Sequence, residues 1–103
     1  FLVSRMDDAI AILDEADRPN LALQFDFYHR QIMDGDLIDG FNTCLPRIGH
    51  VQFADVPGRH EPGTGEISFA NIFAAVDASG YEGWVGAEYL PTGTTAASLG
   101  WLR

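Results

Sequence analysis

The sequence predicts an α/β fold in which parallel strands alternate with helices. Segments with helical spacing of apolar residues alternate along the chain with short apolar runs, the order typical of parallel βαβ units. The short runs are apolar at most positions, as in strands that are buried on both faces of a parallel sheet. Only three such strands are present, and three parallel strands cannot close a barrel. We therefore expect the chain to be part of a larger sheet or barrel, with the remaining strands preceding residue 1.

The first helix is expected over residues 5–15. Apolar residues recur there at helical spacing, namely Met6, Ile10 and Leu13. Ser4 is a favourable N-cap, and Asp7 follows three residues later, where it can complete a capping box.

Further helices are expected along the rest of the chain. Their ranges are 27–33, 37–45, 69–78, and a last helix that ends at Leu102 after a cap at Thr94 or Thr95. Pro46 ends the second of these, because proline lacks a backbone N–H and clashes with the preceding turn. Ser68 is expected to cap the third, and Gly80 to end it. Trp84 and Trp101 are expected in the core.

The expected strands span residues 21–26, 50–54 and 84–88. In the second strand His50 and Gln52 lie two residues apart and point to one face, while Val51 and Phe53 point to the other. Buried polar side chains are costly without partners, so the imidazole and the amide are expected to line a site. The polar, glycine-rich loop that follows is richer in charged residues than a simple turn requires.

Each strand delivers an oxygen donor at or near its C-terminal end, namely Asp26, Gln52 and Glu88. Sites in parallel-sheet proteins lie at these ends. Two carboxylates and an amide oxygen suit Mg²⁺ or Mn²⁺. Such an ion can stabilise an enediolate while a neighbouring carboxylate moves a proton. Taken singly, Asp26 could be only a helix cap, Gln52 a core amide and Glu88 a solvated carboxylate.

Three basic or imidazole side chains extend the candidate site. His29 lies one turn into the helix after Asp26, where its ring could bind a substrate hydroxyl or donate a proton, or simply be a surface histidine. Arg59 could hold a carboxylate through its bidentate fork, or be a solvated loop residue. His50 could orient a metal ligand, or fill the interior of the barrel.

Composition narrows the class of protein. The net charge of −9 argues against nucleic-acid binding, which requires a basic footprint. The single Cys44 excludes an internal disulfide and a thiolate zinc cluster. No segment approaches the ~20 apolar residues of a membrane span. We expect a cytoplasmic protein that acts on a small molecule, with neither a nucleic acid nor a membrane as partner.

Three motifs together resemble the hydroxypyruvate isomerase family of xylose-isomerase-like TIM barrels. They are FDFYHRQ at residues 25–31, GHVQFADVPGRHEPGTGEI at residues 49–67 and GWVGAEYLP at residues 83–91. The resemblance implies a partial (β/α)₈ TIM barrel. Residues 1–103 would be the C-terminal portion, about the last three βα units, of a barrel of about 250 residues.

The resemblance also implies an activity, the metal-dependent interconversion of hydroxypyruvate and tartronate semialdehyde by proton transfer through a metal-bound enediolate. Asp26, Gln52 and Glu88 match the positions that bind Mg²⁺ or Mn²⁺ in the superfamily, and Glu88 also matches an acid–base carboxylate. His29 and Arg59 match substrate-contacting positions. The second catalytic glutamate of the family has no counterpart here, so the isolated chain is expected to be inactive.

Three alternatives stay open. The reaction could be that of a 2-oxo-tetronate isomerase or a ketose epimerase of the same superfamily. The chain could instead be a non-catalytic half-barrel that functions only by association, for example as a homo-oligomer, since its parallel edges are exposed. A superfamily endonuclease is the third, and the acidic charge and the lack of further metal ligands speak against it.

Overall fold

The computed structural model describes residues 5–102, which form a three-stranded parallel sheet in the order β1-β2-β3. The strands are β1 (Leu23–Asp26), β2 (Ile48–Phe53) and β3 (Val85–Ala87). The helices are α1 (Met6–Ala16), α2 (Phe27–Met33), α3 (Leu37–Cys44) and α4 (Phe69–Ser79), with 3₁₀ segments at Leu45–Arg47 and Ala97–Leu102. The predicted alternation of helices with parallel strands is confirmed.

The ends of the later helices agree with the sequence in part. Gly80 ends α4 in the left-handed region with φ +81°, as predicted. Ser68 occupies the N-cap position of α4, but its side chain makes no capping hydrogen bond. The last helix is a 3₁₀ helix, and the Thr94 hydroxyl accepts a hydrogen bond from the Ala97 N–H at 3.1 Å. Within residues 5–102 no helix is long and apolar enough to cross a membrane.

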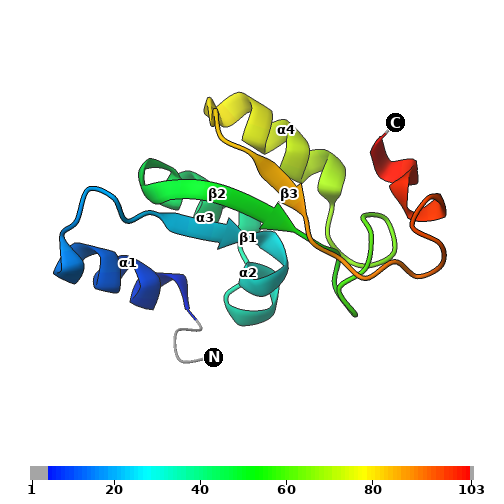
Figure 1. The fold of residues 1–103 in the computed structure, drawn as a ribbon, viewed down its shortest axis with the longest axis horizontal. Coiled ribbons are helices and arrows are strands. Elements are labelled where there is room, and N and C mark those ends of the chain that lie inside the picture. Colours follow the sequence, from blue (N-terminus) through cyan, green and yellow to red (C-terminus); the bar gives the residue numbers. More distant parts are fainter. Residues whose placement is uncertain (1–4, 103) are drawn as a thin grey trace.

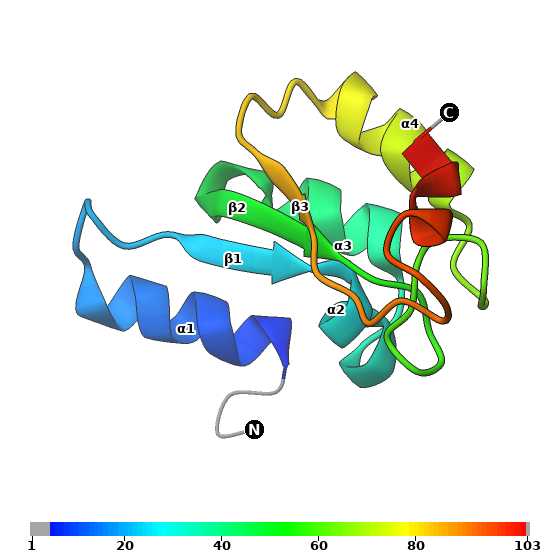
Figure 2. The same ribbon diagram turned by 45° about the vertical axis from the view of Figure 1, so that its right-hand side comes forward.

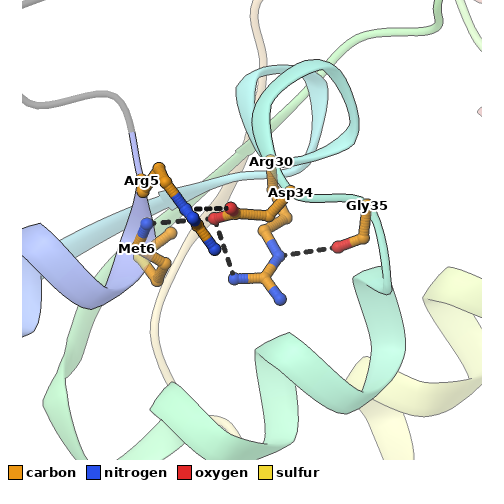
Figure 3. Close-up of polar contacts among 5 residues, drawn as sticks. All are labelled: Arg5, Met6, Arg30, Asp34 and Gly35. Atoms are coloured by element: carbon orange, nitrogen blue, oxygen red, sulfur yellow. Dashed lines mark hydrogen bonds and ion pairs between the residues drawn. The ribbon is translucent and has the colours of Figure 1, made fainter.

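The start of α1 is capped by a residue that the sequence did not indicate. Ser4 lies outside the described residues, and Arg5, at the N-cap position, makes no side-chain capping bond. The carboxylate of Asp34, just after α2, instead accepts the Met6 N–H at 3.0 Å and the Arg5 Nε–H at 3.0 Å (Figure 3). Arg30 also binds this carboxylate, at 3.3 Å. The N-terminus of α1 is therefore tied to the C-terminus of α2.

The sheet has one apolar and one polar face, because residues that pair across parallel strands share a face. Phe25 pairs with Val51 on the apolar face, and Asp26 pairs with Gln52 on the polar face. Helices α3 and α4 lie behind the sheet in Figure 2. Within residues 5–102 this polar face is partly accessible, since Gln24 is exposed and His50 and Gln52 are half-buried.

Aromatic rings build the core on the face covered by helices. Phe25 is fully buried and meets the Phe41 ring edge-on, with centroids 5.6 Å apart. The Phe53 ring meets Trp101 edge-on at 5.2 Å, so Trp101 packs against the core as predicted. The prediction for Trp84 is wrong, since its side chain is 84% exposed. Trp84 precedes the edge strand β3, where no described element covers it.

Candidate functional site

The C-terminal ends of the strands meet at one end of the sheet, beside the start of α2 and the loops that follow β2 and β3 (Figure 1). Asp26 is the last residue of β1 and pairs directly with Gln52. Gln52 also pairs with Gly86, two residues before Glu88. The Glu88 N–H donates to the Phe53 carbonyl at 3.0 Å and so continues the ladder beyond β3. Asp26, Gln52 and Glu88 therefore share one face at one end of the sheet.

Asp26 is buried, and it caps α2 with one of its carboxylate oxygens. Oδ1 accepts the N–H groups of Tyr28 at 2.9 Å and His29 at 3.3 Å, the usual role of an aspartate at an N-cap. The other oxygen, Oδ2, lies 3.8 Å from His29 Nε2. The helix-cap interpretation is thus correct for Oδ1, while Oδ2 faces the imidazole and has lone pairs left for a cation.

Gln52 is half-buried and makes a hydrogen bond that the sequence did not indicate. Its Oε1 accepts from Gln24 Nε2 at 2.7 Å. A carbonyl oxygen has two lone pairs, so one remains for a metal ion. Gln24 pairs with His50 one step back along the polar face, and His50 is half-buried there. The alternation of β1 was the signal that could have identified Gln24.

Glu88 combines a fixed backbone with an open carboxylate. Its N–H is held by Phe53, and its carbonyl oxygen accepts from Arg59 Nε at 3.2 Å. The side chain is exposed, and within residues 5–102 no hydrogen bond to its carboxylate is formed. The carboxylate can therefore reach a ligand or a substrate while its Cα stays in place.

Arg59 bridges two parts of the site. Besides donating to Glu88, its guanidinium lies 5.2 Å from the centroid of the Tyr28 ring, within the range of a cation–π contact. In the described part of the chain the terminal nitrogens of Arg59 donate to no other group. These nitrogens can accordingly bind a carboxylate in the bidentate manner expected of arginine.

The residue that shapes the loop after β2 is Asp55, a fully buried carboxylate to which the sequence assigned no role. It accepts four backbone N–H groups, from Val56, Gly63, Gly65 and Ile67, at 2.9 to 3.1 Å. At Gly65 a Cβ would overlap the Val56 carbonyl, which explains the glycine. An aspartate at a strand end, followed by a glycine-rich stretch, was the signal available in the sequence.

The loops after β2 and β3 are joined to each other. The Leu90 N–H donates to the Arg59 carbonyl at 2.8 Å, and the Leu90 carbonyl lies 2.7 Å from His60 Nδ1. The Glu61 carboxylate accepts from the Thr92 N–H at 3.0 Å and from its hydroxyl at 3.1 Å. Hydrogen bonds from its own backbone N–H and from Thr92 lower the pKa of Glu61. The two loops therefore form one unit around Arg59 and Glu88.

Among residues 5–102, no three His, Cys, Asp or Glu side chains lie close enough together to hold a metal ion. A cation at this end of the sheet would have to use the Gln52 amide oxygen besides the carboxylates of Asp26 and Glu88. A pocket of about 170 Å³ opens beside Asp26 and His29, between α1, β1 and α2.

Comparison with known proteins places these features in context. The Xylose isomerase-like TIM barrel family matches residues 1–103. The 2-oxo-tetronate isomerase of Cupriavidus necator is 45% identical over 103 residues, which are 100% of this chain and 40% of that protein. The hydroxypyruvate isomerase of Escherichia coli K12 is 45% identical over 94 residues, 91% of this chain and 36% of that protein.

Two crystal structures are similar in fold and in sequence. A Brucella melitensis structure named AP endonuclease, family 2, has a TM-score of 0.95 and 41% identity, covering 99% of this chain and 40% of its own. The apo 3-keto-D-glucoside 4-epimerase of E. coli has a TM-score of 0.86 and 30% identity, covering 98% and 40%. The chain spans at most 40% of the length of each of these relatives.

Proposed function

Because the chain belongs to the xylose isomerase-like TIM barrel family, we propose that it supplies part of the active site of a metal-dependent isomerase. The substrate pair is hydroxypyruvate and tartronate semialdehyde. The observation that carries the proposal is the placement of three oxygen donors, Asp26, Gln52 and Glu88, on one face at the C-terminal ends of three strands. The isomerase names of the similar proteins support the same reaction class.

The three donors fit Mg²⁺ or Mn²⁺ in their chemistry. Asp26 keeps Oδ2 and Gln52 keeps one lone pair, while the Glu88 carboxylate is open. All are hard oxygen ligands, which these cations prefer to nitrogen or sulfur. When bound, such a cation supplies Lewis-acid stabilisation of the negative charge that develops on substrate oxygens.

The remaining residues take roles that follow from their positions. The terminal nitrogens of Arg59 bind the carboxylate of the substrate. They are available because Arg59 Nε donates to the Glu88 carbonyl and one face of the guanidinium lies over the Tyr28 ring. His29, beside Asp26, binds a substrate hydroxyl or gives it a proton. Glu88 exchanges a proton with one of the two reacting carbons, and the acid–base group for the other carbon is expected outside this chain.

A second candidate is the isomerisation of a 2-oxo-tetronate, favoured by the 45% identity with the C. necator enzyme over the whole chain. The two candidates share the reaction type and differ in the length of the substrate. The endonuclease named for the B. melitensis structure is a weaker candidate, because a net charge of −9 opposes binding to a polyanion.

The test uses the complete product of the gene that encodes this chain. Hydroxypyruvate isomerisation is measured with and without EDTA, in the wild type and in Glu88→Gln, with the exposed Glu82→Gln as a matched control. Turnover that requires metal, survives Glu82→Gln and disappears in Glu88→Gln supports the proposal. A folded, Mn²⁺-binding protein that converts only a 2-oxo-tetronate supports the second candidate. Turnover that is indifferent to both EDTA and Glu88→Gln overturns the metal and acid–base assignments.

A further inference from the structure

We propose that Asp55 is a positioning residue for the isomerisation, which holds the loop after β2 in the shape that lets Arg59 fix Glu88. The inference rests on the proposed function, since it concerns the placement of the proposed acid–base carboxylate. Asp55 itself is fully buried, so it acts only through the residues it holds.

The environment of Asp55 shows that its charge serves the loop. Within residues 5–102 no Arg or Lys and no His forms an ion pair with it. Burying an unpaired carboxylate is costly unless hydrogen bonds compensate. The compensating donors are all backbone N–H groups, located at residues 56, 63, 65 and 67. One side chain therefore gathers both ends of the loop around itself.

A continuous set of contacts leads from the backbone of Asp55, in the loop that its carboxylate holds, to the site. The backbone of Asp55 pairs with that of His60 in an isolated antiparallel bridge, with N–H to carbonyl distances of 2.8 and 3.3 Å. Arg59 precedes His60 and has φ +63°, a conformation that non-glycine residues adopt rarely. From there its Nε reaches the Glu88 carbonyl and its guanidinium covers Tyr28. The loop thus carries Arg59 across to the next strand.

Asp55→Asn is the informative change because it keeps the size of the side chain. The amide nitrogen cannot accept a hydrogen bond, so N–H groups that now share one carboxylate oxygen lose their acceptor. Gly63 and Gly65 share Oδ2, while Val56 and Ile67 share Oδ1. Either orientation of the amide therefore releases one side of the loop.

The first experiment compares kcat and KM for hydroxypyruvate in the complete gene product. Asp55→Asn is expected to lower kcat at least about tenfold and to raise KM, because small displacements of reacting groups are costly in rate. Val76→Ala, a buried change in α4, is the control for a general loss of stability and keeps both constants. The same substitution is also made in a protein that already carries Arg59→Lys. There Asp55→Asn is expected to lower kcat by less than about twofold, because the effects of two residues that act through one another are not additive.

The second experiment does not depend on activity. Trypsin cleaves after arginine, so cleavage after Arg59 reports how firmly the loop is held. Asp55→Asn is expected to raise the cleavage rate at this bond at least about tenfold, while Val76→Ala leaves it unchanged. If the wild type does not turn over hydroxypyruvate, the proposed function fails, and the cleavage rate alone decides whether Asp55 positions Arg59.

A milder variant keeps the inference testable if Asp55→Asn does not fold. Gly63 has φ +97° and open space around it, so Gly63→Ala strains the loop without a steric clash and without removing the carboxylate. It is expected to shift kcat and trypsin cleavage in the same direction by a smaller factor. A folded Asp55→Asn protein with wild-type kcat, KM and cleavage rate overturns the proposal.

Discussion

The carboxylate of Asp34 and the backbone N–H of Met6 are joined by a hydrogen bond of 3.0 Å, although the two residues lie 28 positions apart. Asp34 thereby does for α1 what a local N-cap does for most helices. The side chain of Asp34 is only 10% exposed, and Arg5 and Arg30 both contact it. One carboxylate therefore joins the N-terminus of α1 to the end of α2, in addition to the apolar contacts that α1 makes with the core.

Removing this carboxylate should destabilise the fold. Asp34→Ala is expected to lower the free energy of unfolding by about 1–2 kcal/mol, the upper range for losing an N-cap. Asp14→Ala is the control, because the Asp14 side chain is 65% exposed and, among the residues that the structure describes, forms an ion pair with Arg47 alone, so it should cost less than about 1 kcal/mol. Urea unfolding of both variants measures the difference, and equal costs would contradict the capping role.

The same carboxylate predicts a pH dependence. The hydrogen bond from Met6, followed by Arg5 and Arg30, holds the pKa of Asp34 below its ordinary value of 3.8. A lowered pKa in the folded state means stability that is fully present above pH 3.8 and is lost as the pH falls through the folded pKa. The difference in unfolding free energy between the wild type and Asp34→Ala should shrink over that acidic window. A difference that stays constant there would show that the charge of Asp34 contributes nothing.

The helix-capping role of Asp26 and its proposed role as a metal ligand can be separated by two substitutions. Asparagine is as good an N-cap as aspartate, so Asp26→Asn should preserve the stability of α2, whereas Asp26→Ala should cost about 1 kcal/mol. Both should weaken Mn²⁺ binding at least about tenfold, because the negative oxygen is lost in both. Calorimetric titration with Mn²⁺, set beside thermal unfolding, measures the two effects. Unchanged Mn²⁺ affinity in Asp26→Asn would remove Asp26 from the metal site.

Replacing Arg59 by lysine should weaken substrate binding, although the positive charge is kept. A lysine keeps the charge but loses the planar fork, the contact with Tyr28 and the Nε donor to Glu88. Arg59→Lys is therefore expected to raise KM for hydroxypyruvate at least about tenfold. The exposed Arg18→Lys serves as the control for charge-preserving substitution and should leave KM unchanged. A wild-type KM in Arg59→Lys would exclude Arg59 as the carboxylate anchor.

Glycine should be required at position 65 and not at position 93. A Cβ at Gly65 would overlap the Val56 carbonyl and lie 2.8 Å from Asp55 Oδ1, whereas nothing lies within 4 Å of a Cβ at Gly93. Gly65→Ala should lower the unfolding free energy by about 2 kcal/mol or more through overpacking. Gly93→Ala should remain within about 0.5 kcal/mol of the wild type. Thermal unfolding of the pair tests whether the close approach exists in solution.

The sequence predicted those features that depend on local periodicity. The range 27–33 for α2 agrees with the structure because the apolar spacing and the flanking aspartates are local signals. The pairing of Asp26 with Gln52 could also be expected, because parallel strands bring their C-terminal ends to one edge. Periodicity and strand direction depend on a few neighbouring residues, so they can be predicted from the sequence.

Features that depend on distant partners could not be read in this way. Trp84 was expected in the core from its apolar character alone, but it lies just before the edge strand β3, where no described element covers it. The cap of α1 comes from Asp34, and nothing near Met6 indicates it. Likewise, the position of Asp55 at a strand end before a glycine-rich stretch is visible in the sequence, but its four backbone donors, up to 12 residues away, appear only in the structure.

The alternation of β2 places core and site under a single constraint. A shift of one residue in its pairing would turn Val51 and Phe53 outward and Gln52 inward. Such a shift would expose two buried apolar side chains, so the misaligned pairing has a higher free energy than the native one. The pairing of Gln52 with Asp26 is therefore maintained by the stability of the core, whether or not the site itself is altered. Substitutions of polar-face side chains can therefore accumulate without changing the strand pairing that holds them.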